Sequence, residues 1–342
     1  MWSDETGYRL LRDNKRGEPI EIPNTATQGL ASREAWTERV CYLQAFHDAW
    51  NATCSSEEEN PTIIVPGNNT FLVQQVLFSG PCKAKNITFL ILGNMIAPDS
   101  PESWSRLDPS RWLSFRQVEQ LHVTGFGTID GRGEGMWNQS CRYHPHLAMK
   151  FLSCNASSLT NINFINSSQA HILISGSHYF KVDNLLIEAP WNSPNTDGIH
   201  IQSSEQITIS NTMIRTGDDC VSIGDYTSNI HISSSICGPG HGVSIGSLGR
   251  SGNVVQVEDI HHSGVHISNV TYNDLSGTSS TNVAINFNRS RSIACTGIVL
   301  KSINLTSAKP RGRVTSSCTN AYGNVIGGVQ PKPCLLVAKI TA

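Results

Sequence analysis

The chain is poor in charged residues, carries almost no net charge and contains no long apolar run. Asp, Glu, Lys and Arg make up 15% of its 342 residues, and the formal net charge is −2. So small a charge creates no field that would attract nucleic acid, and no basic stripe or nucleic-acid motif is present. No apolar run reaches the length needed to cross a membrane. The composition therefore argues against partners of either kind.

Closely spaced cysteine pairs of the zinc-binding type are also missing, although the chain holds 10 cysteines at irregular spacings. Cysteines in that number are typical of disulfides formed in an oxidising compartment. Asn-x-Ser/Thr sequons, the acceptor pattern for N-glycosylation, point to the same compartment, and we expect only some to be used. We therefore expect a secreted, extracellular glycoprotein. The sequons begin at Asn51, Asn68, Asn86, Asn138, Asn155, Asn166, Asn269, Asn288 and Asn304.

The amino-terminal residues lack the apolar centre of a signal peptide. Residues 1–17 are polar and charged, so no secretion signal can be recognised. Either the protein is not secreted or the start of this chain is incomplete, and the cysteines and sequons favour the second interpretation. We assign no structure to residues 1–30 and expect residues 31–342 to form a single domain, for which the length is ample.

Short segments of alternating apolar and polar residues, broken by Gly, Asn, Ser or Pro, fill the chain from about residue 62 onward. Such segments predict β-strands separated by tight turns. The predicted strands are Thr62–Val65, Ile87–Ile91, Leu121–Thr124, Leu159–Phe164, Ile172–Ser175, Phe180–Ile187, Gly198–Ile201, Gln206–Ile209, Val221–Ile223, Ile230–Ile232, Val243–Ile245, Val265–Val270, Val283–Phe287 and Gly297–Leu305.

An internal repeat specifies how these strands are arranged. The segments 161–164, 184–187, 211–214 and 234–237 follow one another at steps of 23, 27 and 23 residues. A period in the low twenties is typical of one turn of a parallel β-helix. A β-sandwich also has alternating strands, but it returns no polar residue to the same phase. We therefore predict an all-β chain folded as a right-handed parallel β-helix.

Only one stretch has the periodicity of a helix. Between Glu34 and Trp50, apolar residues recur at spacings of three and four. A solenoid exposes the core of its first coil unless something covers it, so we predict that this short helix caps the amino-terminal end. The apolar positions are Trp36, Val40, Leu43, Phe46 and Trp50.

Three carboxylates and a histidine recur at nearly the same period. Asp197 precedes Asp218 by 21 residues, and Asp219 precedes His241 by 22. One period returns a side chain to the same face of the next coil, about 4.8 Å away, so these groups would form one cluster in a surface groove. An isolated Asp-Asp pair is more often a solvated turn, and an isolated histidine is more often structural. The shared phase favours a site of acid–base chemistry.

The stretches around these residues resemble the polygalacturonases, the glycoside hydrolases that cut pectin, and the plant forms fit best. The matching stretches are Asn195–His200, Thr216–Ile223 and Gly238–Gly249, and the resemblance runs from about Leu43 to the carboxyl terminus. It implies hydrolysis of α-1,4 bonds between galacturonates by an inverting mechanism. It also implies pectin as the partner, a monomer, no metal or organic cofactor, and a role in modifying the cell wall.

The resemblance also assigns roles. It makes Asp218 the general acid, makes Asp197 and Asp219 the pair that activates water, and leaves His241 to tune or orient the acid. Hydrolysis needs one carboxylic acid and one carboxylate, and crowding three of them raises the pKa of at least one. The expected substrate-binding residues are Asn195, Gly240, Gly242 and Arg250, although Asn195 also fits a turn or ladder position.

Two disulfides are expected partly from the same resemblance. Cys220 and Cys237 flank the cluster on neighbouring coils, whose spacing suits the Cα separation of a disulfide, and such a bond would brace the acids against His241. Cys318 and Cys334 form the second expected pair.

One part of the family pattern is missing. Polygalacturonases carry an Arg-Ile-Lys motif whose cations grip the galacturonate carboxylates, and this chain lacks it, as if whole coils had been lost after Gly249. The alternative function is therefore a catalytically impaired paralogue that at most binds pectin. A lyase on the same fold is disfavoured because it needs a basic residue in phase with Asp218, and none is present.

Overall fold

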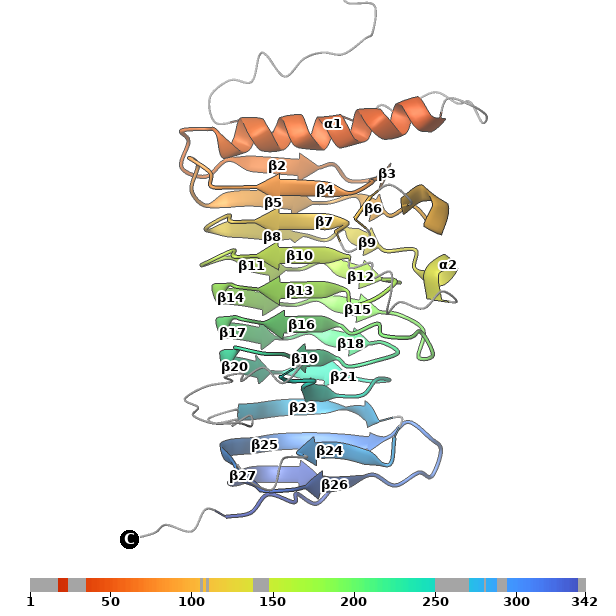
Figure 1. The fold of residues 1–342 in the computed structure, drawn as a ribbon, viewed down its shortest axis with the longest axis vertical. Helices are drawn as coiled ribbons and strands as arrows, with labels where there is room; N and C mark the ends of the chain where they lie inside the picture. The colour runs from red at the N-terminus through yellow and green to blue at the C-terminus, as the bar shows by residue number, and fades with distance from the viewer. Residues whose placement is uncertain are drawn as a thin grey trace, which may run out of the picture.

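The chain folds as a right-handed parallel β-helix whose coils stack along the long axis of the molecule (Figure 1). The computed structural model describes residues 18–23, 35–104, 107–108, 111–137, 148–249, 271–279, 281–287 and 294–337. Every pairing between the described strands is parallel, so the prediction of the fold is confirmed. Within these residues no helix is long and apolar enough to cross a membrane.

The strands form one large sheet that wraps two sides of each coil, a seven-stranded sheet on the third side, and a separate pair. The large sheet contains β1 (Ile20–Glu21), β2 (Thr62–Val65), β3 (Thr70–Leu72), β5 (Ile87–Ile91), β6 (Asn94–Ile96), β8 (Leu121–Gly125), β9 (Thr128–Asp130), β11 (Ser158–Thr160), β12 (Asn163–Ile165), β14 (His178–Asp183), β15 (Leu186–Glu188), β17 (Glu205–Ser210), β18 (Met213–Arg215), β20 (Ser228–Ser233), β21 (Ser235–Cys237), β23 (Thr271–Ser279), β25 (Cys295–Ser307) and β27 (Ala321–Gln330). The seven-stranded sheet contains β4 (Val76–Ser79), β7 (Leu113–Arg116), β10 (Met149–Leu152), β13 (Ile172–Ser175), β16 (Ile199–Gln202), β19 (Val221–Ile223) and β22 (Val243–Ile245). The separate pair is β24 (Val283–Phe287) with β26 (Thr315–Cys318), and the remaining elements are α1 (Ala35–Cys54), η1 (Pro101–Trp104) and α2 (Glu134–Trp137).

Apolar side chains of equal phase stack inside the coils to form the core. In the seven-stranded sheet, Phe78, Phe115 and Phe151 occupy one register and are fully buried. Their rings stack at centroid distances of 4.8 and 5.5 Å. Later coils continue the same column with isoleucine, beginning at Ile174 and Ile201. Because each coil repeats the inward positions of the last, the core fixes the register of the outward-facing residues as well.

The helix α1 lies across the amino-terminal end of the stack, as predicted for a cap (Figure 1). It ends at Cys54, four residues later than the sequence pattern predicts. Phe46 and Trp50 are buried, and their rings contact Phe71, Phe78 and Phe115 of the first coils. In addition β1, which lies in the segment to which no structure was assigned, pairs with β2. The division of the chain at residue 30 stays a prediction.

Two of the predicted strands are wrong because each is a pair of strands in the structure. The segments 159–164 and 180–187 are each divided into two strands, because Asn161 and Asn184 have φ values of 57° and 53° and turn the chain between two sides of the coil. The apolar positions change phase at each asparagine, so the turn left a signal in the sequence that the predicted strand bounds did not use. Several short strands, such as β7 and β10, were also missed. The predicted strand at residues 265–270 lies outside the described residues.

The turn residues between these paired strands form a ladder along the molecule. Asn161, Asn184, Asn211 and Ser234 all have positive φ, between 47° and 57°. The side-chain nitrogen of Asn184 donates to Oδ1 of Asn161 at 2.8 Å. Asparagine adopts this backbone conformation more readily than other non-glycine residues and bonds to its neighbours while doing so. The repeat seen in the sequence is therefore a repeat of turns.

Replacing Asn184 separates these two contributions. Asn184→Ala is expected to destabilise the protein by about 1–3 kcal/mol, since alanine loses the hydrogen bond and also resists positive φ. Asn184→Gly loses only the hydrogen bond and should cost about 1 kcal/mol. Urea unfolding followed by circular dichroism measures both. Equal destabilisation by the two variants would show that the backbone conformation contributes nothing.

Within the described residues the seven-stranded sheet ends at β22. Among the described strands, β24 and β26 pair only with each other. On another side of the coil β23 pairs with both β20 and β21, so the hydrogen bonding there is continuous. A cavity of about 50 Å³, lined mainly by apolar residues of β22, β23, β24 and β25, lies at this level. The carboxyl-terminal coils are thus joined to the rest on one side more firmly than on the other.

Candidate active site

Three turns that lead into neighbouring strands bring the predicted cluster together. Ile199, Val221 and Val243 share one register across β16, β19 and β22. Asp197, Asp219 and His241 each lie two residues before these positions, so stacking of the coils places them in one column. Asp218 precedes Asp219 in the same turn. The convergence predicted from the sequence is correct. The spacing, however, led us to expect Asp218 at the position next to Asp197 on the following coil, whereas the strand register places Asp219 there.

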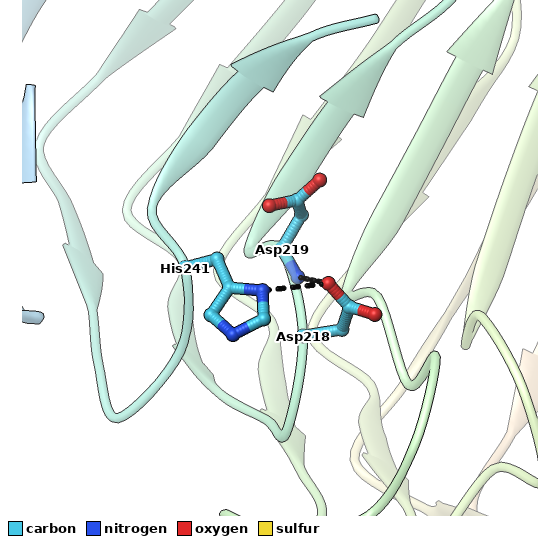
Figure 2. Close-up of side chains that lie close together, drawn as sticks. All are labelled: Asp218, Asp219 and His241. Carbon is cyan, nitrogen blue, oxygen red and sulfur yellow. Dashed lines mark hydrogen bonds and ion pairs between the residues drawn. The ribbon is translucent and has the colours of Figure 1, made fainter. Parts of the chain in front are cut away.

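Asp218 has hydrogen bonds to both of its carboxylate oxygens. Oδ1 lies 2.8 Å from His241 Nδ1 and accepts the Asp219 backbone N–H at 2.9 Å (Figure 2). Oδ2 accepts the side-chain nitrogen of Asn195 at 3.2 Å. Asn195 has a φ of 54°, so it is a turn residue that also orients the acid. The carboxyl group of Asp218 is therefore held in one orientation.

Asp218, Asp219 and His241 each offer one possible metal-ligand atom, and these three atoms lie within 4.8 Å of one another, a spacing that could also suit a metal ion. Both oxygens of Asp218 are already engaged by protein donors. That arrangement suits an acid–base group better than a metal ligand, because a cation would compete with the donors for the same lone pairs. The expectation of a metal-free site stays a prediction.

A polar cavity of about 560 Å³ opens over the cluster. Its walls include the carboxylates of Asp197, Asp218, Asp219 and Asp225. Among the described residues that line it, none is a lysine or an arginine. The remaining lining residues are Gln169, Ala170, Leu173, Asn195, His200, Gln202, Ser222, Gly224, Gly246 and Ser247.

Burial shifts the ionisation of two of the carboxylates. Burial raises the pKa of Asp197 to about 7, a hydrogen bond from Ser222 opposes the shift, and the charges of Asp218 and Asp219 add to it. Burial likewise raises the pKa of Asp219, against a hydrogen bond from Ser244. From the sequence we expected crowding of the carboxylates to raise a pKa, but in the structure loss of solvent is the larger cause of the raised pKa. At least one carboxyl group can therefore hold a proton at mildly acidic pH.

Two serines that sequence reasoning missed support these carboxylates. Ser222 donates to Oδ2 of Asp197 at 2.6 Å, and Ser244 donates to Oδ2 of Asp219. Each serine lies 25 residues after its partner, on the next coil, so the two contacts repeat one device. The signal was present in the sequence, because the serines follow Asp219 and His241 by the same three residues. It could not be interpreted without knowing which way each side chain points.

Glycines flank His241 for different reasons. Gly240 has a φ of 152°, and a Cβ there would lie 2.9 Å from the carbonyl oxygen of Asp218. Gly242 has a φ of 90°, and a Cβ there would have no neighbour closer than 4.0 Å. Contact of these glycines and Asn195 with a substrate stays a prediction. Arg250 lies outside the described residues.

Disulfides brace the site and both ends of the solenoid. Cys220 and Cys237 are bonded, as are Cys318 and Cys334, so both expected pairs are confirmed. Cys220 follows Asp219 directly, and Cys237 ends the strand before the turn of His241. A third disulfide, which the sequence did not predict, joins Cys54 at the end of α1 to Cys82.

Comparison with known proteins identifies the family of this chain. The profile of Glycosyl hydrolases family 28 matches residues 54–264 and 258–327, two stretches that meet where the sequence suggests lost coils. A polygalacturonase of Prunus persica is 34% identical over 85% of this chain and 89% of its own. Polygalacturonase-2 of Solanum lycopersicum is 32% identical over 84% of this chain and 76% of its own.

Solved structures show the same fold. The endo-xylogalacturonan hydrolase of Aspergillus tubingensis superposes with a TM-score of 0.63, over 84% of this chain and 96% of that one, at 18% identity. The stacked parallel coils, the family profile and the plant relatives agree with one another. The chain belongs to glycosyl hydrolases family 28, among the plant-type polygalacturonases, and is thus a pectin-degrading glycoside hydrolase by family.

Proposed function

We propose that this protein is a polygalacturonase that hydrolyses α-1,4 bonds between galacturonates with inversion at the anomeric carbon. The observation that carries the proposal is the oriented Asp218, with His241 on one oxygen, facing a cavity that is also lined by the half-buried carboxylates of Asp197 and Asp219. An inverting hydrolase needs an acid for the leaving oxygen and a base for the attacking water. The three aspartates supply both.

In this mechanism Asp218 donates its proton to the glycosidic oxygen as the bond to the anomeric carbon breaks. Asp197 and Asp219, one coil apart, hold a water molecule and remove its proton as its oxygen attacks the opposite face of the sugar. His241 Nδ1, at 2.8 Å from Oδ1 of Asp218, orients the acid and stabilises the carboxylate that remains. His241 and Asp218 therefore act as one unit.

The alternative is a catalytically impaired paralogue that at most binds pectin. It is favoured by the missing Arg-Ile-Lys motif and by the absence of lysine and arginine among the described residues of the cavity wall. Loss of a charged hydrogen bond to a substrate carboxylate costs about 1.5–3 kcal/mol. We favour the active enzyme because specific hydrogen bonds hold the proposed acid Asp218 to His241. The two carboxylates proposed to activate water are likewise each held by a serine.

The purified protein is expected to release reducing ends from polygalacturonate at mildly acidic pH, at a rate that rises toward neutral pH as Asp197, whose pKa is raised to about 7, loses its proton and can act as a base. Proton NMR of the first products should show the anomer opposite to that of the substrate, because the water attacks from the far side. Retention of configuration would exclude the inverting mechanism. A folded protein that releases no reducing ends but retains affinity for polygalacturonate would be the impaired paralogue.

The setting of this activity is part of the proposal. We infer that the protein is secreted, acts as a monomer on pectin in the cell wall, and contributes to its modification. Three disulfides support an oxidising compartment, where such bonds persist. The exposed side chains of Asn51, Asn68 and Asn86 leave those sequons accessible to glycosylation.

A further inference from the structure

A hydrogen-bonded chain leads from Asp197 to a histidine that the proposed mechanism does not use. Ser222 Oγ lies 2.6 Å from Oδ2 of Asp197 and 2.7 Å from Nδ1 of His200. His200 Nε2 in turn lies 3.3 Å from Oε1 of Gln202, whose amide nitrogen donates to Ser175 at 3.4 Å. His200 and Gln202 both line the cavity. The carboxylate of Asp197, the hydroxyl of Ser222 and the ring of His200 therefore form a continuous hydrogen-bonded path that begins at the proposed base.

We propose that Asp197, Ser222 and His200 form a proton relay, in which the proton that Asp197 takes from the attacking water passes through the Ser222 hydroxyl to His200. This inference rests on the proposed function, because it assumes that Asp197 acts on water. His200 does not touch the reacting atoms, so it is a positioning residue and a proton store. It restores Asp197 to its charged form without a second water molecule.

The transfer balances in both protons and charge. With Asp197 protonated, its O–H donates to Ser222 Oγ, the serine O–H donates to His200 Nδ1, and the neutral ring keeps its proton on Nε2. Ser222 then gains the proton from Asp197 while it gives its own to Nδ1. The result is a carboxylate, an unchanged serine and an imidazolium. Oε1 of Gln202 is placed to accept the Nε2 proton in both states. Because His200 lines the cavity, it can release the extra proton to solvent.

The neighbouring coil supplies a comparison within the same molecule. Ser244 donates to Asp219 as Ser222 donates to Asp197, and His200, Ser222 and Ser244 occupy one register across three strands. The position that His200 occupies beside Ser222 is therefore occupied beside Ser244 by Ser222 itself. Serine cannot hold an extra proton. Asp197 thus has a relay and Asp219 has only a hydrogen bond, although both are carboxylates of the same site.

Other ionisable groups surround the relay. Asp218 and Asp219 face Asp197 from the turn before β19, and His241 lies in the turn before β22. Asp225, after β19, lines the same cavity. The buried ring of His171, before β13, lies 2.9 Å from the backbone oxygen of Asp197 and accepts the backbone N–H of Ser167 at 3.3 Å. Each of these groups influences the pH profile, so the test must isolate the pair formed by Ser222 and His200.

A double-mutant cycle isolates that pair. His200→Gln and Ser222→Ala are each expected to lower kcat on the order of tenfold, a fraction of the hundredfold or more that a general base supplies. Together they should cost no more than either alone, because both break the same path. His200→Gln combined with Ser244→Ala is the matched control, and those losses should multiply. Multiplying losses in both pairs, or an unchanged kcat for His200→Gln, would overturn the relay.

Chemical rescue tests the proton directly. Imidazole added to His200→Gly should restore part of kcat, since it can occupy the vacated space and accept from Ser222. The same addition should do nothing for the His200→Gly, Ser222→Ala double variant. Ser222→Thr keeps the hydroxyl and should retain most of the activity. Rescue that does not depend on Ser222 would contradict the proposed path.

An NMR titration tests whether His200 is coupled to Asp197, and it does not require catalytic turnover. The ring signals of His200, identified by their loss in His200→Gln, should titrate with a lower midpoint in Asp197→Asn and in Ser222→Ala than in the wild type, because the imidazolium loses its carboxylate or its connection to it. Unchanged midpoints in both variants would disprove the relay even if the enzyme is active. A wild type that is coupled but hydrolyses no polygalacturonate would instead disprove the proposed function.

Discussion

Asp218→Asn is expected to lose about a thousandfold or more of the rate of polygalacturonate hydrolysis, while the protein remains folded. An amide has the shape of the carboxyl group, and its oxygen can still accept from His241 and from the backbone N–H of Asp219. It cannot give a proton to the leaving oxygen, however, and that step has no substitute in the described site. Initial rates of reducing-end release, with circular dichroism as the test of folding, measure the effect.

Asp225→Asn is the matched control for this variant. Asp225 lines the same cavity, but its Oδ1 accepts the backbone N–H of Gly249 at 3.0 Å, which makes it a support of the cavity wall. We expect Asp225→Asn to slow hydrolysis by less than about twofold, compared with the thousandfold loss expected for Asp218→Asn. Retention of more than a tenth of the wild-type rate by Asp218→Asn would remove Asp218 from the role of acid.

Asp197→Asn is expected to abolish hydrolysis and yet to stabilise the fold at neutral pH. The pKa of Asp197 is about 7 in the folded protein, against an ordinary value of 3.8. Between these values the folded state holds a proton that the unfolded state has lost. The free energy of unfolding of the wild type therefore falls as pH rises through this interval, and it stays low above it. Asparagine has no charge to bury and does not lose this stability.

The size of this gain in unfolding free energy depends on how strongly the folded protein disfavours the charged form of Asp197. One pKa unit corresponds to about 1.4 kcal/mol, so the full shift would give roughly 4 kcal/mol. Relaxation around the charge and coupling to the other carboxylates reduce this, and we expect on the order of 2 kcal/mol at pH 8.

Denaturant unfolding of the wild type and Asp197→Asn at two pH values checks this expectation. At pH 4 the wild-type carboxyl group is protonated in the folded state, so the two proteins should have nearly equal stability. That comparison is the internal control for any effect of the amide itself. A variant no more stable than the wild type at pH 8 would show that Asp197 ionises without cost, and burial could then not be what prepares it for its role.

The sequence predicts the coils and the position of the cluster because both follow from one period. Each coil stacks on the last, so the repeated asparagine turns and the spacing from Asp197 to His241 translate directly into space. Contacts that depend on side-chain direction were not predictable. The spacing of Ser222 and Ser244 is regular in the sequence, but only the structure shows that each points back toward a carboxylate on the preceding coil.

Features that depend on contacts between distant elements were also missed. The disulfide between Cys54 and Cys82 requires knowing that the end of α1 lies over the first coils, which no local pattern reveals. The one-residue turns at Asn161 and Asn184 do leave a local signal, because the phase of the apolar residues shifts at each of them, but that shift was not recognised as a turn. Conversely, the pairs Cys220–Cys237 and Cys318–Cys334 were predicted partly from the family resemblance, and the first pair also from the spacing of neighbouring coils.

The end of the seven-stranded sheet at β22 gives the molecule an uneven mechanical stiffness. Ladder hydrogen bonds resist the separation of coils. In the part of the chain that the structure describes, β22 and β24 share no such bonds, while β23 keeps them on another side. Bending should therefore concentrate at this level, with the continuous side acting as a hinge. The small cavity at this level is lined by Gly242, which directly follows His241. Bending of the rod at this level would thus move the surface directly beyond His241 relative to the cavity over the aspartates, and a polymer bound across both halves would damp that motion.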